Sequence, residues 1–150
     1  METGQMADLL RRVRHDFANH LQVVSGYLDI GKPQQARDYL RQVIDEMNAA
    51  RTVFDHPSSE AALYFYRQML QASELGFKLH FQNLAADDWE IFKLHNEPLR
   101  TLEKFNQSRM MHQENDEVRL SFGCDEQGVT MCFTFPGREG EAQLIRIDRE

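Results

Sequence analysis

This sequence of 150 residues has few cysteines and no excess of basic charge, and each shortage argues against a class of protein. The two cysteines, Cys124 and Cys132, stand within strand-like segments. We expect two reduced, buried thiols there, because a disulfide scaffold or a metal site would need more ligands nearby. The formal net charge of −7 argues against nucleic acid as the main partner, since a phosphate backbone binds basic surfaces.

The sequence also lacks a segment that would hold it in a membrane. Its longest uncharged apolar runs, such as Val129–Phe135, are too short to span a bilayer. The first residues mix acids, arginines and glutamine without an apolar block, so we expect no signal peptide and a cytoplasmic protein. With 41% hydrophobic and 27% charged residues, the chain has the composition of a folded domain or of two small subdomains.

Two helical patterns begin the sequence. Between Met6 and Ile30, apolar residues recur every three or four positions and fall within about 80° on one side of a helix. This apolar stripe consists of Leu10, Val13, Phe17, Leu21, Val24 and Leu28. Gly31 suits a helix end, and Pro33 suits the first turn of a second helix that continues to about Phe54. The short link between the patterns predicts an antiparallel helical hairpin.

The fold class that we predict is α+β, with a domain boundary at residue 56. Residues 1–56 form the helical hairpin, which buries its stripes by homodimerisation into a four-helix bundle. Residues 57–150 form a small α/β sandwich. Helices are expected over 61–75 and from Pro98 to about Met111, and strands over 77–84, 117–122, 129–135 and 142–148.

The stretch from Arg14 to Gln22 carries the residues most suited to chemistry. His15 lies about 150° from the middle of the apolar stripe, so we expect its imidazole to face water. A neutral imidazole is a good nucleophile near neutral pH. Asp16 could orient the ring or accept a proton, although its position also fits a merely solvated acid.

The outward face of the first helix is rich in basic and amide side chains. Arg11, Asn19 and Gln22 lie on the same side as the histidine, within one or two turns. The three arginines Arg11, Arg12 and Arg14 would favour an incoming anion such as a phosphoryl group. They would also attract a cluster of carboxylates on a partner.

A metal site on this helix is a poorer interpretation. His15 and His20 are five positions apart, which sets them ~140° apart around a helix. Helical zinc pairs instead use histidines four positions apart, and no third ligand is evident. We therefore expect no metal bound by this chain.

The run from Arg14 to Leu21, together with Gly26-Tyr27-Leu28 and the segment from Gln35 to Leu40, resembles a known phospho-acceptor hairpin. This is the hairpin of the sporulation-initiation phosphotransferase B family, and the same box occurs in the citrate and C4-dicarboxylate class of sensor histidine kinases. The pattern is arginine, histidine, acid, aromatic, any residue, asparagine, histidine or lysine, leucine. With its accompanying segments it covers roughly the first third of the chain.

The resemblance implies a homodimeric bundle in which His15 is the phospho-acceptor, assisted by Asp16 and Asn19. The phosphoryl group would come from the aspartyl phosphate of a single-domain response regulator and would pass to the receiver of a sporulation transcription factor. The surface that docks these regulators would consist of Arg11, Arg14, Ala18 and Gln22. The chain itself would bind no cofactor, and Mg²⁺ would come with the partner regulator.

The second domain resembles a shortened ATP-binding domain of such kinases, but the nucleotide motifs are missing. Gln107 stands where a kinase helix would offer a magnesium-holding asparagine. Phe135-Pro136-Gly137 stands where a kinase would present an Asp-x-Gly-x-Gly loop that reads the adenine. The resemblance therefore implies a degenerate kinase ATPase-like domain and a phosphotransferase that works without ATP. Two alternatives stay open: the catalytic core of a sensor histidine kinase, and a non-catalytic dimeric module that binds regulators.

Overall fold

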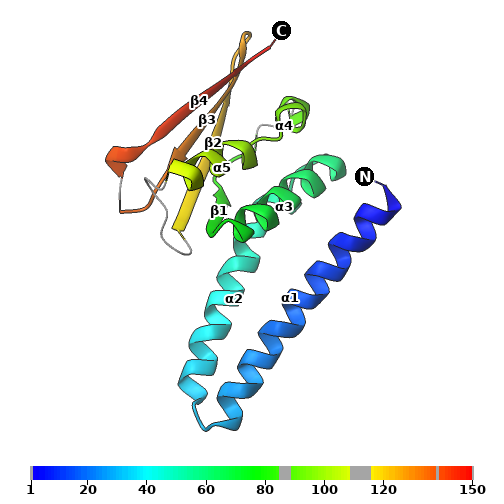
Figure 1. Ribbon diagram of the computed structural model, residues 1–150, viewed down its shortest axis with the longest axis vertical. Helices are drawn as coiled ribbons and strands as arrows, with labels where there is room; N and C mark the ends of the chain where they lie inside the picture. The colour runs from blue at the N-terminus through cyan, green and yellow to red at the C-terminus, as the bar shows by residue number, and fades with distance from the viewer. Residues whose placement is uncertain (1, 85–88, 109–115, 138, 150) are drawn as a thin grey trace. The chain divides into compact units, whose positions relative to one another are not determined.

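The computed structural model describes residues 2–84, 89–108, 116–137 and 139–149, and its contacts divide the chain into two compact units, Met1–Ala49 and Ala50–Glu150 (Figure 1). The first unit consists of helix α1 (Thr3–Asp29) and most of helix α2 (Pro33–Phe54). The boundary predicted at residue 56 lies just after the end of α2, whereas the last turn of that helix, from Ala50 on, has its contacts in the second unit.

The two long helices form the expected antiparallel hairpin. Gly31 adopts a φ of 71°, a left-handed conformation that glycine reaches without strain, and it ends α1. The first helix begins three residues earlier than the apolar pattern suggested, at Thr3 instead of Met6. A capping box explains the extra turn, because Glu2 and Gln5 satisfy each other's backbone N–H groups.

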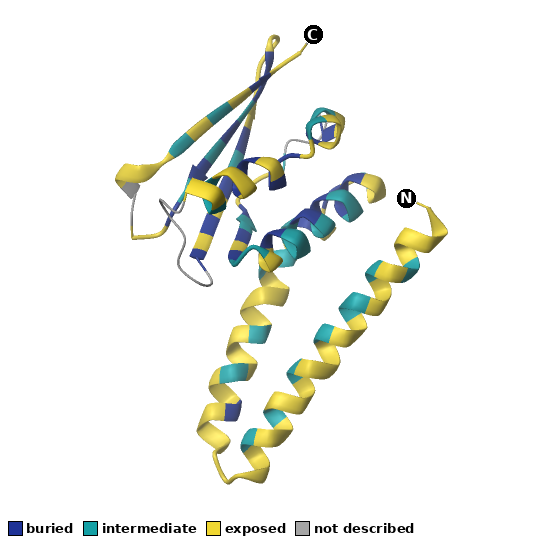
Figure 2. Ribbon diagram, in the orientation of Figure 1, coloured by how far each residue is buried: buried dark blue, intermediate teal, exposed yellow. Residues whose placement is uncertain are grey.

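The apolar stripe of α1 is largely exposed in the chain taken by itself (Figure 2). The residues along its middle, Leu10, Phe17, Leu21 and Leu28, have exposed fractions of 62, 53, 53 and 56%. Most of the half-buried residues lie on one flank of the stripe, the side on which His20 reaches Tyr39 of α2. They include Leu9, Val13, Asp16, His20, Val24 and Tyr27. The hairpin therefore covers the flank of the stripe and leaves its centre open.

The second unit is a four-stranded sheet with helices packed against one face. The strands are β1 (Phe77–Phe81), β2 (Asp116–Cys124), β3 (Gly128–Thr134) and β4 (Gln143–Asp148), in the spatial order β1-β2-β3-β4. The pair β1–β2 is parallel, with Leu79 beside Val118, and the other two pairs are antiparallel. The chain passes from β1 to β2 through α4 (Trp89–His95) and α5 (Leu99–Ser108), while α3 (Ser59–Glu74) precedes the sheet.

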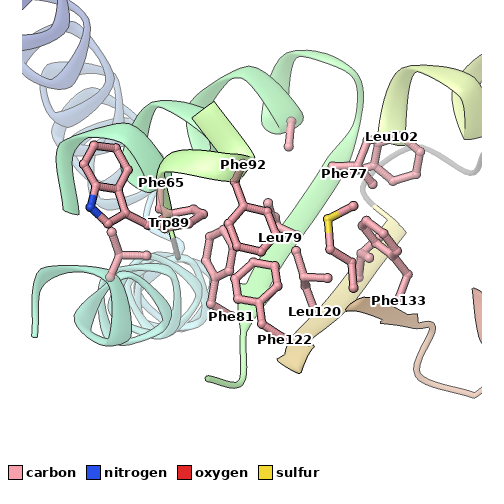
Figure 3. Packing of buried hydrophobic residues seen from close by; sticks show 14 of the residues in the cluster. Phe65, Phe77, Leu79, Phe81, Trp89, Phe92, Leu102, Leu120, Phe122 and Phe133 are labelled. Atoms are coloured by element: carbon pink, nitrogen blue, oxygen red, sulfur yellow. The ribbon is translucent and has the colours of Figure 1, made fainter. Parts of the chain in front are cut away.

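Aromatic rings fill the space between the helices and the sheet (Figure 3). The fully buried Phe65 of α3 contacts Phe81 and Phe122 of the sheet, with ring centroids 5.3 and 5.7 Å apart. Phe92 of α4 stacks on Phe122 at 4.4 Å. Trp89 and Tyr64 join this cluster at a centroid distance of 6.1 Å and contribute to the core of the second domain.

A buried polar network fixes the connection between α4 and α5 to α3. The hydroxyl of Tyr64 donates to the carbonyl oxygens of Phe92 and Glu97, at 2.8 and 2.6 Å. The Gln68 amide donates to Asn96 Oδ1 and accepts from the N–H of Leu99. These contacts satisfy backbone groups that the turn would otherwise bury without a partner.

Two expectations from the sequence need correction, and one helix was not predicted. Helix α4 has no counterpart among them, because its seven residues are too few to show a helical period. The strand expected over 77–84 ends at Phe81, and beyond it Asn83 Oδ1 takes the place of a backbone acceptor for the N–H of Phe122. The expected buried thiols are also wrong, since Cys124 is exposed and Cys132 is half-buried, both as free cysteines. The expected helix end near Met111 lies outside the described residues.

Candidate functional site

His15 lies in the middle of α1, on a helix that runs without interruption for 27 residues. Its side chain is 74% exposed, which confirms the prediction that the imidazole faces water. The backbone beneath it is held by helical hydrogen bonds on both sides, so the position of the ring's attachment is fixed while the ring itself is accessible.

Two polar side chains face the same nitrogen of His15. Asp16 Oδ1 lies 3.6 Å from His15 Nδ1, and Asn19 Nδ2 lies 3.4 Å from the same atom. The second carboxylate oxygen of Asp16 lies 3.8 Å from Nε of Arg12, one turn earlier on the helix. The Nδ1 side of the imidazole is therefore placed among polar groups of its own helix, and Nε2 is the nitrogen directed away from them.

The basic residues around His15 are exposed to solvent. Arg11 pairs with Asp8 at 2.7 Å, and both side chains are 76% exposed. An ion pair at such exposure contributes only about 0–1 kcal/mol, so a partner's anion could replace it at little cost. Arg14, Ala18 and Gln22 are also exposed, and their role in docking a partner stays a prediction.

His20, five residues after His15, joins the two helices through polar contacts. No role was predicted for it from the sequence. His20 Nδ1 lies 2.7 Å from the hydroxyl of Tyr39 on α2, and His20 Nε2 lies 4.0 Å from Glu46 Oε2. Two features of the sequence point to His20. It occupies a defined position in the phospho-acceptor pattern, and it falls on the flank of the apolar stripe.

Residues 1–55 match a family described as the alpha-helical domain of SpoOB-type sensor kinases. Residues 1–55 are therefore similar to a SpoOB-type helical domain. The match confirms the resemblance drawn from the His15 motif and sets this domain in the context of two-component phosphotransfer. A comparison of the whole chain with curated proteins finds no match.

The match to the SpoOB-type domain ends at residue 55 and leaves the second unit without an assigned family. In that unit, Gln107 is exposed near the end of α5. Phe135, which follows β3, is buried against the ring of Phe105 at a centroid distance of 6.0 Å.

Neither a membrane helix nor a metal cluster is found among the residues that the structure describes. No helix in this part of the chain combines the length and the apolar character needed to cross a membrane. No three histidine, cysteine or acidic side chains in it converge as metal ligands would.

Proposed function

We propose that this protein is a relay phosphotransferase that carries a phosphoryl group on His15 between the aspartates of two response regulators, in the initiation of sporulation. The observation that carries the proposal is the placement of His15. Its ring is exposed on a rigid helix, and two polar side chains face Nδ1 while Nε2 points away from them. The SpoOB-type helical domain supports the same context of two-component phosphotransfer.

The geometry supports attack by Nε2. Its lone pair forms a bond to phosphorus as the bond between phosphorus and the regulator's aspartyl oxygen breaks, and the aspartate leaves as a carboxylate. Attack by Nε2 requires the tautomer with hydrogen on Nδ1, in which the Asn19 amide presents its oxygen to Nδ1, because its nitrogen and Nδ1–H are both donors. Phosphorylation makes the ring positively charged, and Asp16 Oδ1 at 3.6 Å compensates that charge. The reverse sequence at a second regulator returns the phosphoryl group to an aspartate.

For this reaction the chain needs to supply little more than a correctly positioned histidine and neutralising charge. Phosphoryl transfer passes through a loose transition state, so in-line alignment and charge neutralisation supply most of the catalysis. The regulator would bring its own aspartate and Mg²⁺. The exposed guanidinium groups of Arg11 and Arg14 would dock the acidic rim of that site.

Homodimerisation is part of the proposal. The exposed centre of the apolar stripe on α1 lies beside the flank that contacts α2. On α2, Leu40, Ile44 and Met47 continue the same exposed apolar surface, with exposed fractions of 40, 52 and 64%. In a four-helix bundle each helix contacts two neighbours, so a second hairpin would cover this surface and leave His15 on the outside.

Independence from ATP is the third part of the proposal. A kinase needs an acid after the strand corresponding to β3 to read the adenine base. Here the buried ring of Phe135 stands at that point of the chain. The side chain therefore contributes to the core of the second unit, which supports a degenerate ATPase-like domain that no longer binds nucleotide.

The test compares two phosphoryl donors. The full-length protein is incubated with radiolabelled ATP and, separately, with a single-domain response regulator carrying a labelled aspartyl phosphate. We expect acid-labile, alkali-stable label from the regulator alone, and none in the His15→Gln variant. His56→Gln serves as the matched control, because that histidine lies in the second unit.

Other outcomes would favour the alternatives. Label from ATP would identify a sensor kinase core and contradict the interpretation of the second domain. Regulator binding that survives His15→Gln, with no label from either donor, would identify a non-catalytic module.

A further inference from the structure

Within the phospho-acceptor motif, the side chain of His20 contacts the other helix of the hairpin. Its Nδ1 lies 2.7 Å from the Tyr39 hydroxyl, and the two rings are tilted by 55° with centroids 5.7 Å apart. The His20 side chain is 30% exposed and Glu46 lies beyond it, with Oε2 at 4.0 Å from Nε2. One imidazole therefore bridges α1 to two side chains of α2.

The direction of the hydrogen bond depends on which nitrogen of His20 carries hydrogen, and the phenol is the donor when Nδ1 has none. Burial, and to a smaller extent the charges of Glu46 and Tyr27, raise the pKa of Tyr39 above its ordinary value. The phenol keeps its proton and donates it to Nδ1 of a neutral His20, whose own hydrogen is then on Nε2, toward Glu46. If the ring gains a proton, Nδ1 donates to the phenol oxygen instead and the cation faces a carboxylate. The bridge is therefore compatible with both states.

The apolar packing around this bridge is sparse. The half-buried row of α1 reads Val13, Asp16, His20, Val24, so the two positions between the valines are polar. Apolar side chains pack with little directional preference, whereas a hydrogen bond between two fixed rings holds over a narrow range of rotation and translation. The contact of His20 with Tyr39 is a directional contact between α1 and α2 at this level of the hairpin.

The rotation of α1 also sets the direction of His15. The two histidines lie five residues apart on one uninterrupted helix, so ~140° of helix surface separates them and any turn of α1 moves both. The geometry points to His20 as a positioning residue that, hydrogen-bonded to Tyr39, holds His15 in line with the regulator's phosphoryl group. The inference rests on the proposed phosphotransfer function.

Kinetics of transfer from a phosphorylated response regulator test the inference. Tyr39→Phe removes only the hydroxyl, and His20→Leu removes both polar atoms at similar volume. We expect each to lower kcat by about 10- to 100-fold, because small misplacements of reacting groups cost up to ~10²-fold, while KM for the regulator changes by less than about twofold. The double variant should be no slower than the worse single variant, since both remove one interaction.

Rescue and control variants separate positioning from stability. His20→Asn places an amide near the position of Nδ1 and should recover most of kcat. Ser25→Ala removes a hydroxyl from an exposed position of α1 and should leave kcat unchanged. The inference is overturned if His20→Asn is as slow as His20→Leu, or if the variants change KM and thermal stability alone.

Nuclear magnetic resonance of the imidazole nitrogens gives a readout that does not need a working regulator. His20 should show hydrogen on Nε2 at neutral pH. Tyr39→Phe should shift the ring signals of both His20 and His15, whereas Ser25→Ala should shift neither. Signals of His15 that stay in place in Tyr39→Phe would overturn the inference. Wild-type protein that takes no label from any regulator would instead contradict the proposed function.

Discussion

Asp16 places one carboxylate oxygen 3.6 Å from Nδ1 of His15 and the other 3.8 Å from Nε of Arg12. The side chain is 46% exposed, so the guanidinium and the ring share a carboxylate that also contacts solvent. Adjacent residues on a helix point in different directions, yet Nδ1 of His15 and Oδ1 of Asp16 come within 3.6 Å of each other. We propose that Asp16 compensates positive charge on the ring.

We predict that Asp16→Asn slows phosphorylation of His15 by about 10²-fold, the lower end of what a positioned acid or base contributes. The amide keeps the size of the side chain but loses the charge that compensates the phosphorylated ring. Single-turnover labelling from a phosphorylated regulator measures the rate. Asp29→Asn, a carboxylate at the end of the same helix, should leave the rate unchanged. Equal rates for wild type and Asp16→Asn would reduce Asp16 to a solvated acid.

The proposed homodimer would bury the exposed centre of the apolar stripe. Leu21 belongs to the stripe, and its neighbour Gln22 faces the opposite side with His15. We predict that Leu21→Glu converts a dimer into a monomer, because the charge would be buried among apolar side chains in the bundle. Gln22→Glu adds the same charge outside the interface and should leave a dimer. Sedimentation or light scattering distinguishes the two masses, and a dimer that persists in Leu21→Glu would disprove this interface.

The second unit should be sensitive to loss of its central ring. Phe65 is fully buried and contacts Phe81, Phe92 and Phe122. We predict that Phe65→Ala lowers the free energy of unfolding by about 3–5 kcal/mol, the sum of lost burial and the cavity left behind.

The single tryptophan, Trp89, lies in the same core and reports this unfolding by fluorescence in urea. Leu94→Ala, at a side chain that is 81% exposed, should change the stability by less than about 0.5 kcal/mol. A similar small effect of Phe65→Ala would show that the ring is not part of a well-packed core.

The buried carboxyl group of Glu97 should make the stability of the second unit depend on pH. Burial raises the pKa of Glu97 above its ordinary value of 4.5, and the hydrogen bonds from Thr101 and the charges of Lys104 and Arg100 lower it by less. The folded protein therefore binds this proton more tightly than the unfolded chain. The resulting stabilisation is full below pH 4.5 and is lost as the pH rises through the raised pKa.

Glu97→Gln keeps an acceptor oxygen for the N–H and hydroxyl of Thr101 and removes the titration. We predict that it is more stable than wild type at pH 7 and that this advantage shrinks toward pH 4.5. Urea unfolding followed by Trp89 fluorescence at several pH values measures the difference. Glu103→Gln, at an exposed position of α5, should show no such trend. An advantage for Glu97→Gln that grows as the pH falls would contradict the sign.

The sequence was sufficient for the hairpin because each of its features is local. A helical period over more than 20 residues, Gly31 and Pro33 at the turn, and a chemical motif at His15 are all patterns of neighbouring residues. The exposure of His15 follows from the same geometry, since a helix has one period and an apolar stripe defines its inner side. The positions of the strands along the chain were also visible in the second unit, because alternating apolar residues mark them.

Contacts between distant residues were decided only by the tertiary structure. Nothing near His20 in the sequence indicates Tyr39, which lies 19 residues away and meets it because the hairpin closes with one particular rotation. The strand pattern predicts that Cys124 is buried, yet this residue is exposed at the end of β2, beside the turn. A local pattern predicts whether a residue belongs to a helix or a strand, and on which side of that element it lies. Which element then covers that side is settled by packing across the whole fold, because burial depends on every neighbour in space.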